Sequence, residues 1–302
     1  MYKAIAFQSE GATIRGRFYM PGNKREGLPV IIMAHGYSAT IEGMVADRYA
    51  EVFCNHDFAV LLYDHHSFGI SDGEPGQQVN KWTQARGYRD AINFVSTLSE
   101  IDNTKIALWG DSMSASEVIV VAAIDHRVKA VIAQVPALGD VLPPPDPDGK
   151  LFASIRDTFL NGNIEGTPET TFGPMPVVSF DQETIPSMLA PLTAYRWFLE
   201  YGGRYNTQWK NRVTHVEPPV PVKFNSVLCI PYIKAALFML VAFDDEMEGA
   251  SSEVARTAFN VAPQPKLLLE IDGGHFGILH YPSQLFDEAS AAQVNFLNQY
   301  LK

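Results

Sequence analysis

A serine with small residues on both sides lies in the stretch W-G-D-S-M-S, residues 109–114. A serine on a tight turn between a buried strand and a helix needs small neighbours two positions away, because larger side chains collide across the turn. Gly110 and Ser114 meet this requirement on either side of Ser112. Such a turn exposes the serine hydroxyl as a nucleophile and directs the amide of Met113 toward the same point.

Serine is also a common first residue of helices, so Ser112 alone could simply cap the helix that follows it. Three further segments favour the nucleophile. Each of them follows an apolar run that we expect to form a strand, and each contains a residue type that acyl transfer requires.

The first segment is H-G-Y-S, residues 35–38, which follows the apolar run V-I-I-M-A. In open α/β sheets, ligands bind at the carboxyl ends of the strands, where this segment is expected to lie. The amide of Tyr37 is therefore a candidate to form an oxyanion hole with the amide of Met113. The alternative is a plain strand-to-helix turn in which Gly36 supplies an unusual backbone angle.

The other two segments supply a base and an acid. His275 lies in G-G-H-F-G directly after the run K-L-L-L-E-I, and Asp244 and Asp245 follow the run at 235–243. An acid at this position can orient His275 and stabilise its protonated ring, but the spacing alone leaves both aspartates open. The chain order serine, aspartate, histidine is the order of one hydrolase architecture.

The rest of the chain predicts the elements that position these residues. We expect a hairpin at 3–9 and 12–20, then strands at 30–34, 58–63, 105–109, 128–135, 235–243 and 266–271. Helices are expected between them at about 42–55, 80–98, 113–124 and 251–261, with a last helix at 284–301. Strands that alternate with helices predict an α/β fold with a mostly parallel central sheet and helices on both faces.

The alternation stops between residues 138 and 230, where prolines and aromatic residues accumulate around helical patches at 151–160 and 187–202. We interpret residues 138–230 as a cap or lid that is inserted into a body formed by 1–137 and 231–302. Its aromatic content is too high for a disordered linker.

Composition limits the partners. The 302-residue chain has 23 basic and 34 acidic residues without a basic cluster, so nucleic acid is not an expected partner. Two isolated cysteines, the absence of an apolar run of about 20 residues and an N-terminus unlike a signal peptide predict a cytoplasmic protein that does not bind membranes. We expect a small-molecule substrate, and a homodimer remains open.

The stretches W-G-D-S-M-S, I-D-H-R-V-K-A-V-I-A-Q-V-P and N-R-V-T-H-V-E-P resemble the α/β-hydrolase superfamily, with its dienelactone-hydrolase-like and Xaa-Pro-peptidase-like serine hydrolases as the nearest members. The resemblance implies Ser112 as nucleophile, His275 as general base and Asp245 as triad acid, with Asp244 in reserve and Asp140 as a weaker reserve. We expect the amides of Tyr37 and Met113 to form the oxyanion hole, and we expect no cofactor.

Two departures from the family pattern stand out. Ser114 replaces a glycine, and His66 replaces an arginine in D-H-H-S-F-G-I-S-D-G, residues 64–73. The adjacent His65 and His66 do not predict a metal site, because neighbouring histidines chelate poorly and no third ligand has a familiar spacing.

The substrate expected from this pattern is a small or medium-sized, neutral and partly apolar carboxylic ester, because no cluster of arginine or lysine marks an acidic group. An amidase or peptidase, a thioesterase, a carbon–carbon bond hydrolase and an acyltransferase all use the same triad and stay as alternatives. A non-catalytic binding module is disfavoured, because the three triad residues are all present.

Overall fold

The computed structural model describes residues 2–22, 26–162 and 168–302. Eight strands form a central sheet in the order β1-β2-β4-β3-β6-β7-β10-β11. Their bounds are β1 Tyr2–Ser9, β2 Ala12–Tyr19, β3 Leu28–Ala34, β4 Ala59–Tyr63, β6 Ile101–Asp111, β7 Val128–Gln134, β10 Ala236–Ala242 and β11 Lys266–Ile271. β2 pairs antiparallel with β1 and β4, and all other neighbours are parallel. The predicted mostly parallel sheet is confirmed.

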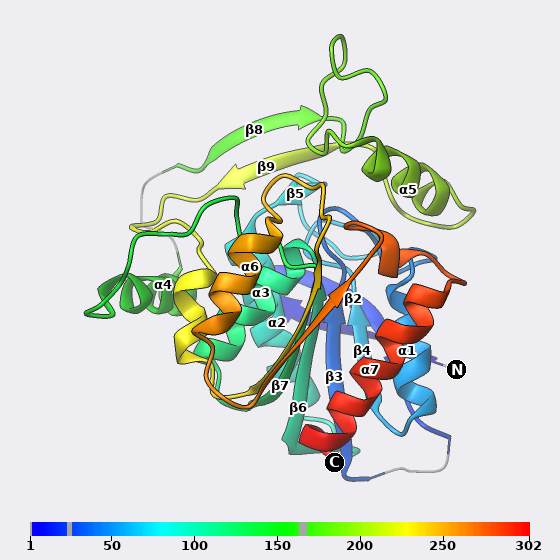
Figure 1. The fold of residues 1–302 in the computed structure, drawn as a ribbon. Coiled ribbons are helices and arrows are strands. Elements are labelled where there is room, and N and C mark those ends of the chain that lie inside the picture. The colour runs from blue at the N-terminus through cyan, green and yellow to red at the C-terminus, as the bar shows by residue number, and fades with distance from the viewer. Residues whose placement is uncertain (1, 23–25, 163–167) are drawn as a thin grey trace.

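Helices cover both faces of this sheet (Figure 1). They are α1 Ala46–Asn55, α2 Lys81–Val95, α3 Met113–Ile124, α4 Lys150–Asn161, α5 Leu192–Gly202, α6 Ser252–Asn260 and α7 Gln284–Leu301, with short 3₁₀ turns η1 Val227–Tyr232 and η2 Gly277–Leu279. α2, α3 and α6 bury their apolar sides in one cluster, and α1 and α7 in the other. Within the described ranges, none of these helices combines the length and the apolar character that crossing a bilayer requires.

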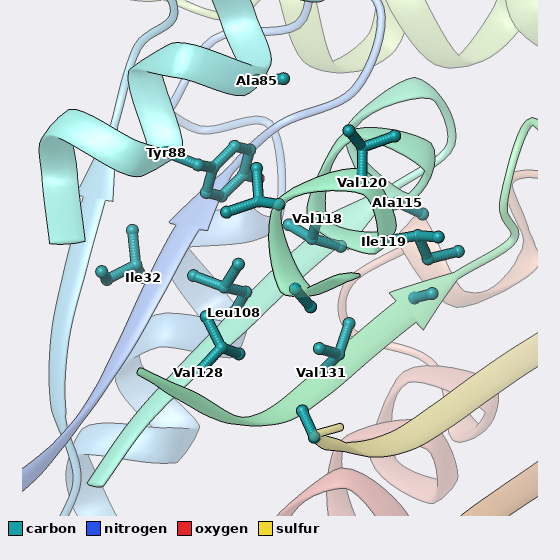
Figure 2. Packing of buried hydrophobic residues seen from close by; sticks show 14 of the residues in the cluster. Ile32, Ala85, Tyr88, Leu108, Ala115, Val118, Ile119, Val120, Val128 and Val131 are labelled. Atoms are coloured by element: carbon teal, nitrogen blue, oxygen red, sulfur yellow. The ribbon is translucent and has the colours of Figure 1, made fainter. Parts of the chain in front are cut away.

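Buried aliphatic side chains fix the central strands beneath α2 and α3. In Figure 2, Ile32 of β3, Leu108 of β6 and Val131 of β7 pack with Tyr88 of α2 and Val118 of α3. Burial of one such aliphatic side chain contributes about 1.5–3 kcal/mol. The carboxyl end of β6, which leads into Ser112, is therefore attached to a rigid core.

Two helix boundaries differ from the sequence prediction for local reasons. The helix predicted from residue 42 begins at Ala46, because Gly43 and Val45 adopt left-handed backbones with φ of 69° and 79°. The helix predicted over 80–98 ends at Val95, and Asn80 caps it by accepting the amides of Trp82 and Thr83.

A second, three-stranded sheet has the order β5-β9-β8, with β5 Gln78–Val79, β8 Thr170–Met175 and β9 Val213–Glu217. Together with α5 it lies at one end of the central sheet (Figure 1). The segment 138–230 thus pairs with body residues through β5, and its α4 packs into the same apolar cluster as α2 and α3. The division into a body and a separate cap therefore stays a prediction.

Candidate active site

Ser112 occupies a strained turn between β6 and α3. Its backbone has φ of 54° and ψ of −116°, and its side chain makes no capping hydrogen bond to the helix. This geometry differs from that of a capping serine, which is extended and accepts an amide of the first turn. A Cβ on Gly110 would lie 2.5 Å from the carbonyl group of Ser114, so the turn requires glycine there.

His275 lies in the loop that follows β11, where Gly273 and Gly274 both have positive φ. Its Nδ1 is 2.8 Å from Oδ2 of Asp245, and both side chains are 3% exposed. The second oxygen of Asp245 accepts the amide of Met247 at 3.0 Å. A buried carboxylate in this position fixes the ring and leaves its Nε2 free for proton transfer.

The acids next to Asp245 hold the histidine loop by its backbone. Asp244 accepts the amide of Gly274 at 3.0 Å, and Glu246 accepts the amide of His275 at 3.0 Å. Asp140, the weaker reserve, accepts the amide of Gly249 at 2.9 Å. The structure therefore brings Asp245, and neither of the two reserve acids, to the ring of His275. Sequence reasoning did not single out Glu246, which lies one residue beyond the chosen acid.

The segment H-G-Y-S packs directly against the serine turn. A Cβ on Gly36 would lie 2.7 Å from the carbonyl oxygen of Asp111 and 3.0 Å from Cβ of Ser112. The carboxylate of Asp111 accepts the amide of Gly36 at 3.0 Å and lies 3.1 Å from Nδ1 of His35. His35 is thus buried and helps to hold this loop against the serine turn.

The two amides that were predicted to stabilise an oxyanion have no hydrogen-bond partner within the described residues. Tyr37 lines a small cavity of about 30 Å³ together with Ser112 and His275. Met113, Tyr37, Ser112 and His275 all line an adjoining cavity of about 480 Å³. The candidate nucleophile, base and amide donors therefore meet at one site.

Within the described chain, no hydrogen bond joins Ser112 to His275. Such contacts are often long in unliganded hydrolases and tighten when substrate binds. The walls of the smaller cavity include Trp197 and Phe198 of α5, and Met188 and Leu189 add apolar surface to the cavities.

A buried polar group lies beneath the serine turn. The hydroxyl of Ser114 is 2.7 Å from the carbonyl oxygen of His35, 2.8 Å from Nε2 of His65 and 3.1 Å from Oε2 of Glu117. Burial lowers the pKa of His65 to about 3, and burial raises the pKa of Glu117 well above its ordinary value of 4.5.

The pKa shifts of His65 and Glu117 agree with the hydrogen bonds that the Ser114 hydroxyl can make. The hydroxyl of Ser114 has one proton to donate. The carbonyl oxygen of His35 can only accept, so it takes this proton. His65 and a protonated Glu117 then donate to the oxygen of Ser114. Ser114, which the sequence analysis treats as a small neighbour of Ser112 and a departure from glycine, thus links three segments below the nucleophile. Glu117 was missed because a single glutamate in an apolar helix has no motif.

His65 and His66 do not act together. His65 faces Ser114, whereas His66 lines a different cavity with Glu74 and Arg86. Across the ranges that the structure describes, no group of three or more His, Cys, Asp or Glu side chains is placed to hold a metal ion.

Residues 26–167 match the family model described as serine aminopeptidase, S33. The solved structure of DcsB in complex with its substrate analogue is similar over 100% of this chain and 99% of that chain, with a TM-score of 0.74 and 25% identity. The chain has the α/β-hydrolase fold.

Two curated relatives match this chain over most of their length. A thiohydrolase from Eupenicillium brefeldianum is 27% identical over 91% of this chain and 87% of its own. A polyketide transferase from Penicillium crustosum is 26% identical over 99% of this chain and 98% of its own. Together with the family match, these similarities support a hydrolytic enzyme.

Proposed function

We propose that this α/β hydrolase cleaves carboxylic esters through an acyl intermediate on Ser112. The observation that carries the proposal is the 2.8 Å contact between His275 and Asp245, because His275 lines the same cavity as Ser112. A serine hydroxyl is a weak nucleophile until a neighbouring base removes its proton.

In the first half-reaction, Oγ of Ser112 attacks the ester carbonyl while Nε2 of His275 takes its proton. The amides of Tyr37 and Met113 stabilise the oxyanion, and loss of one such donor typically costs about 10²–10³ in rate. The carbon–oxygen bond then breaks, and His275 returns its proton to the leaving alcohol.

In the second half-reaction, His275 takes a proton from water, and the resulting hydroxide attacks acyl-Ser112. Collapse of this second oxyanion releases the acid, and His275 returns the proton to Ser112. Asp245 keeps the ring in one tautomer in both halves and stabilises its protonated form.

A thioester is the second candidate, and the thiohydrolase relative is the observation that favours it. The same steps apply, with a thiol in place of the alcohol. The polyketide transferase relative favours a variant in which an acceptor other than water removes the acyl group. Matched oxygen and sulfur esters of one acid, with and without an added alcohol acceptor, separate these three outcomes.

The test of the proposal itself needs no knowledge of the substrate. Treatment with a fluorophosphonate should give one adduct by intact mass, and peptide mapping should assign it to Ser112. The Ser112→Ala variant should stay unlabelled. A folded wild-type protein that forms no adduct, or that is labelled elsewhere, would contradict the proposed nucleophile.

A further inference from the structure

Lys81 lines the cavity of the candidate active site. It is the first residue of α2 and is half-buried. It lines the cavity of about 480 Å³ together with Ser112, Met113 and His275. It is the one lysine or arginine among the described residues that line this cavity.

The surroundings of Lys81 are unfavourable for a cation. The amino end of a helix has a partial positive charge, which repels a lysine there. The first turn of α2 contains no acidic residue. Within the described residues, the ammonium group of Lys81 makes no ion pair or hydrogen bond.

The carboxyl group that acts on it most is Glu117, which is fully buried and held protonated by its raised pKa. Burial lowers the pKa of Lys81, and a neutral Glu117 does not offset this effect. A half-buried cation without a partner is costly unless something else supplies the counter-charge.

Other ionisable groups of the cavity do not supply it. Asp140 and Glu248 also line the cavity, but both are exposed, and within the described residues neither forms an ion pair with Lys81. His215 of β9 lines the cavity as well, and its pKa is lowered by burial and then by the charge of Lys81. A neutral imidazole provides an N–H donor and no negative charge.

We propose that Lys81, with His215 as a second donor, binds a carboxylate on the acyl part of the substrate. The inference rests on the proposed acyl-Ser112 mechanism and names its substrate class: half-esters or half-thioesters of dicarboxylic acids. We assign the carboxylate to the acyl part of the substrate. The acyl part stays bound through both half-reactions, so a contact with its carboxylate can contribute to both. The sequence predicts a neutral substrate from the lack of a basic cluster, and this single lysine, brought to the cavity by the fold, revises that expectation.

Turnover of two matched esters tests the selectivity. One is the para-nitrophenyl half-ester of adipic acid, and the other is the same compound with its free acid capped as a methyl ester. Lys81→Met should lower kcat/KM for the half-ester by about 10- to 100-fold, which is the range for a hydrogen bond to a charged group. The capped ester should change by less than about threefold. Lys81→Arg should restore part of the preference.

Lys223→Met is the matched control. Lys223 lines the neighbouring cavity that Lys81 also borders, but it is exposed and does not line the cavity of Ser112. It should leave both esters unchanged. Equal losses on both esters in Lys81→Met, or no loss on either, would overturn the inference.

A binding experiment separates this inference from the proposed mechanism. Calorimetric titration of the Ser112→Ala protein with adipate should give binding that Lys81→Met abolishes and Lys223→Met preserves. If Ser112 is labelled by the fluorophosphonate but adipate does not bind, or binds equally without Lys81, the inference fails alone. If Ser112 is not labelled, the proposed function fails, whereas adipate binding that depends on Lys81 still supports the anion site.

Discussion

Oδ2 of Asp245 lies 2.8 Å from Nδ1 of His275, while the adjacent Asp244 accepts a backbone amide of the histidine loop. The spacing in the sequence left both aspartates open as the acid that orients His275. In the structure, these two neighbouring carboxylates have different contacts. Asp245 contacts the ring that is proposed to move protons. Asp244 contacts only the backbone that positions this ring.

This difference predicts unequal effects of two conservative substitutions. Asp245→Asn should lower kcat by about 10⁴-fold, because an amide stabilises the wrong tautomer of His275 and not its protonated form. Asp244→Asn should lower it by less than about tenfold, because the amide oxygen still accepts the amide of Gly274. Steady-state kinetics on one ester compare the two variants. The reverse ranking would assign the acid to Asp244.

Removal of the nucleophile or the base should abolish turnover without unfolding the protein. Ser112→Ala and His275→Ala should each lower kcat by about 10⁴- to 10⁶-fold, and the double variant should be no worse, because the two groups act as a unit. Ser116→Ala is the control, since this buried hydroxyl bonds the carbonyl of Met113 from within α3. Circular dichroism verifies the fold, and full activity of Ser112→Ala would contradict the mechanism.

The tight turn at Ser112 predicts a large effect of one methyl group. Gly110→Ala places a Cβ 2.5 Å from the carbonyl group of Ser114, so the turn must shift. We expect a loss of about 1–3 kcal/mol in the free energy of unfolding and about 10²-fold in kcat/KM, because the nucleophile is displaced.

Gly76→Ala is the matched control for this substitution, because a Cβ there meets no atom within 4 Å. Urea unfolding and ester kinetics measure both variants. Equal behaviour of the two would mean that the turn is not the element that positions Ser112.

The buried Glu117 predicts a pH-dependent stability. Its pKa is raised in the folded protein, so above its ordinary value of 4.5 the folded state binds a proton that the unfolded state releases. Stability must then fall as pH rises, by at most about 1.4 kcal/mol per pH unit. Glu117→Gln removes this linkage, so its stability relative to wild type should increase from pH 5 to pH 8. Urea unfolding at both pH values measures the difference, and a constant difference would contradict a protonated Glu117.

Much of this site could be expected from local sequence, because its main residues follow apolar strands. Runs such as K-L-L-L-E-I and V-I-I-M-A define the carboxyl edge of the sheet, and the strand at 266–271 and the helices at 113–124 and 284–301 are confirmed to the residue. Gly110 could be recognised because a tight turn restricts its type.

Other features depend on contacts that only the tertiary fold creates. β8 is exposed along nearly its whole length and lacks the apolar alternation that marks a half-buried strand. Lys81 belongs to a helix about 30 positions before Ser112, and no spacing rule brings it to the cavity. The one local signal for Lys81 was a lysine at the start of a helix without an acid nearby, which is an unfavourable placement that suggests a ligand.

The two-residue strand β5 joins the two groups proposed to hold the substrate acid. It pairs with β9 so that Val79 lies opposite His215, and Lys81 follows two positions later. Selectivity and chemistry are therefore encoded in separate pieces of the chain. Recombination with a relative that exchanges residues 168–217 would alter acid preference while the serine turn and its base stay intact, provided that the incoming segment still pairs with Gln78 and Val79.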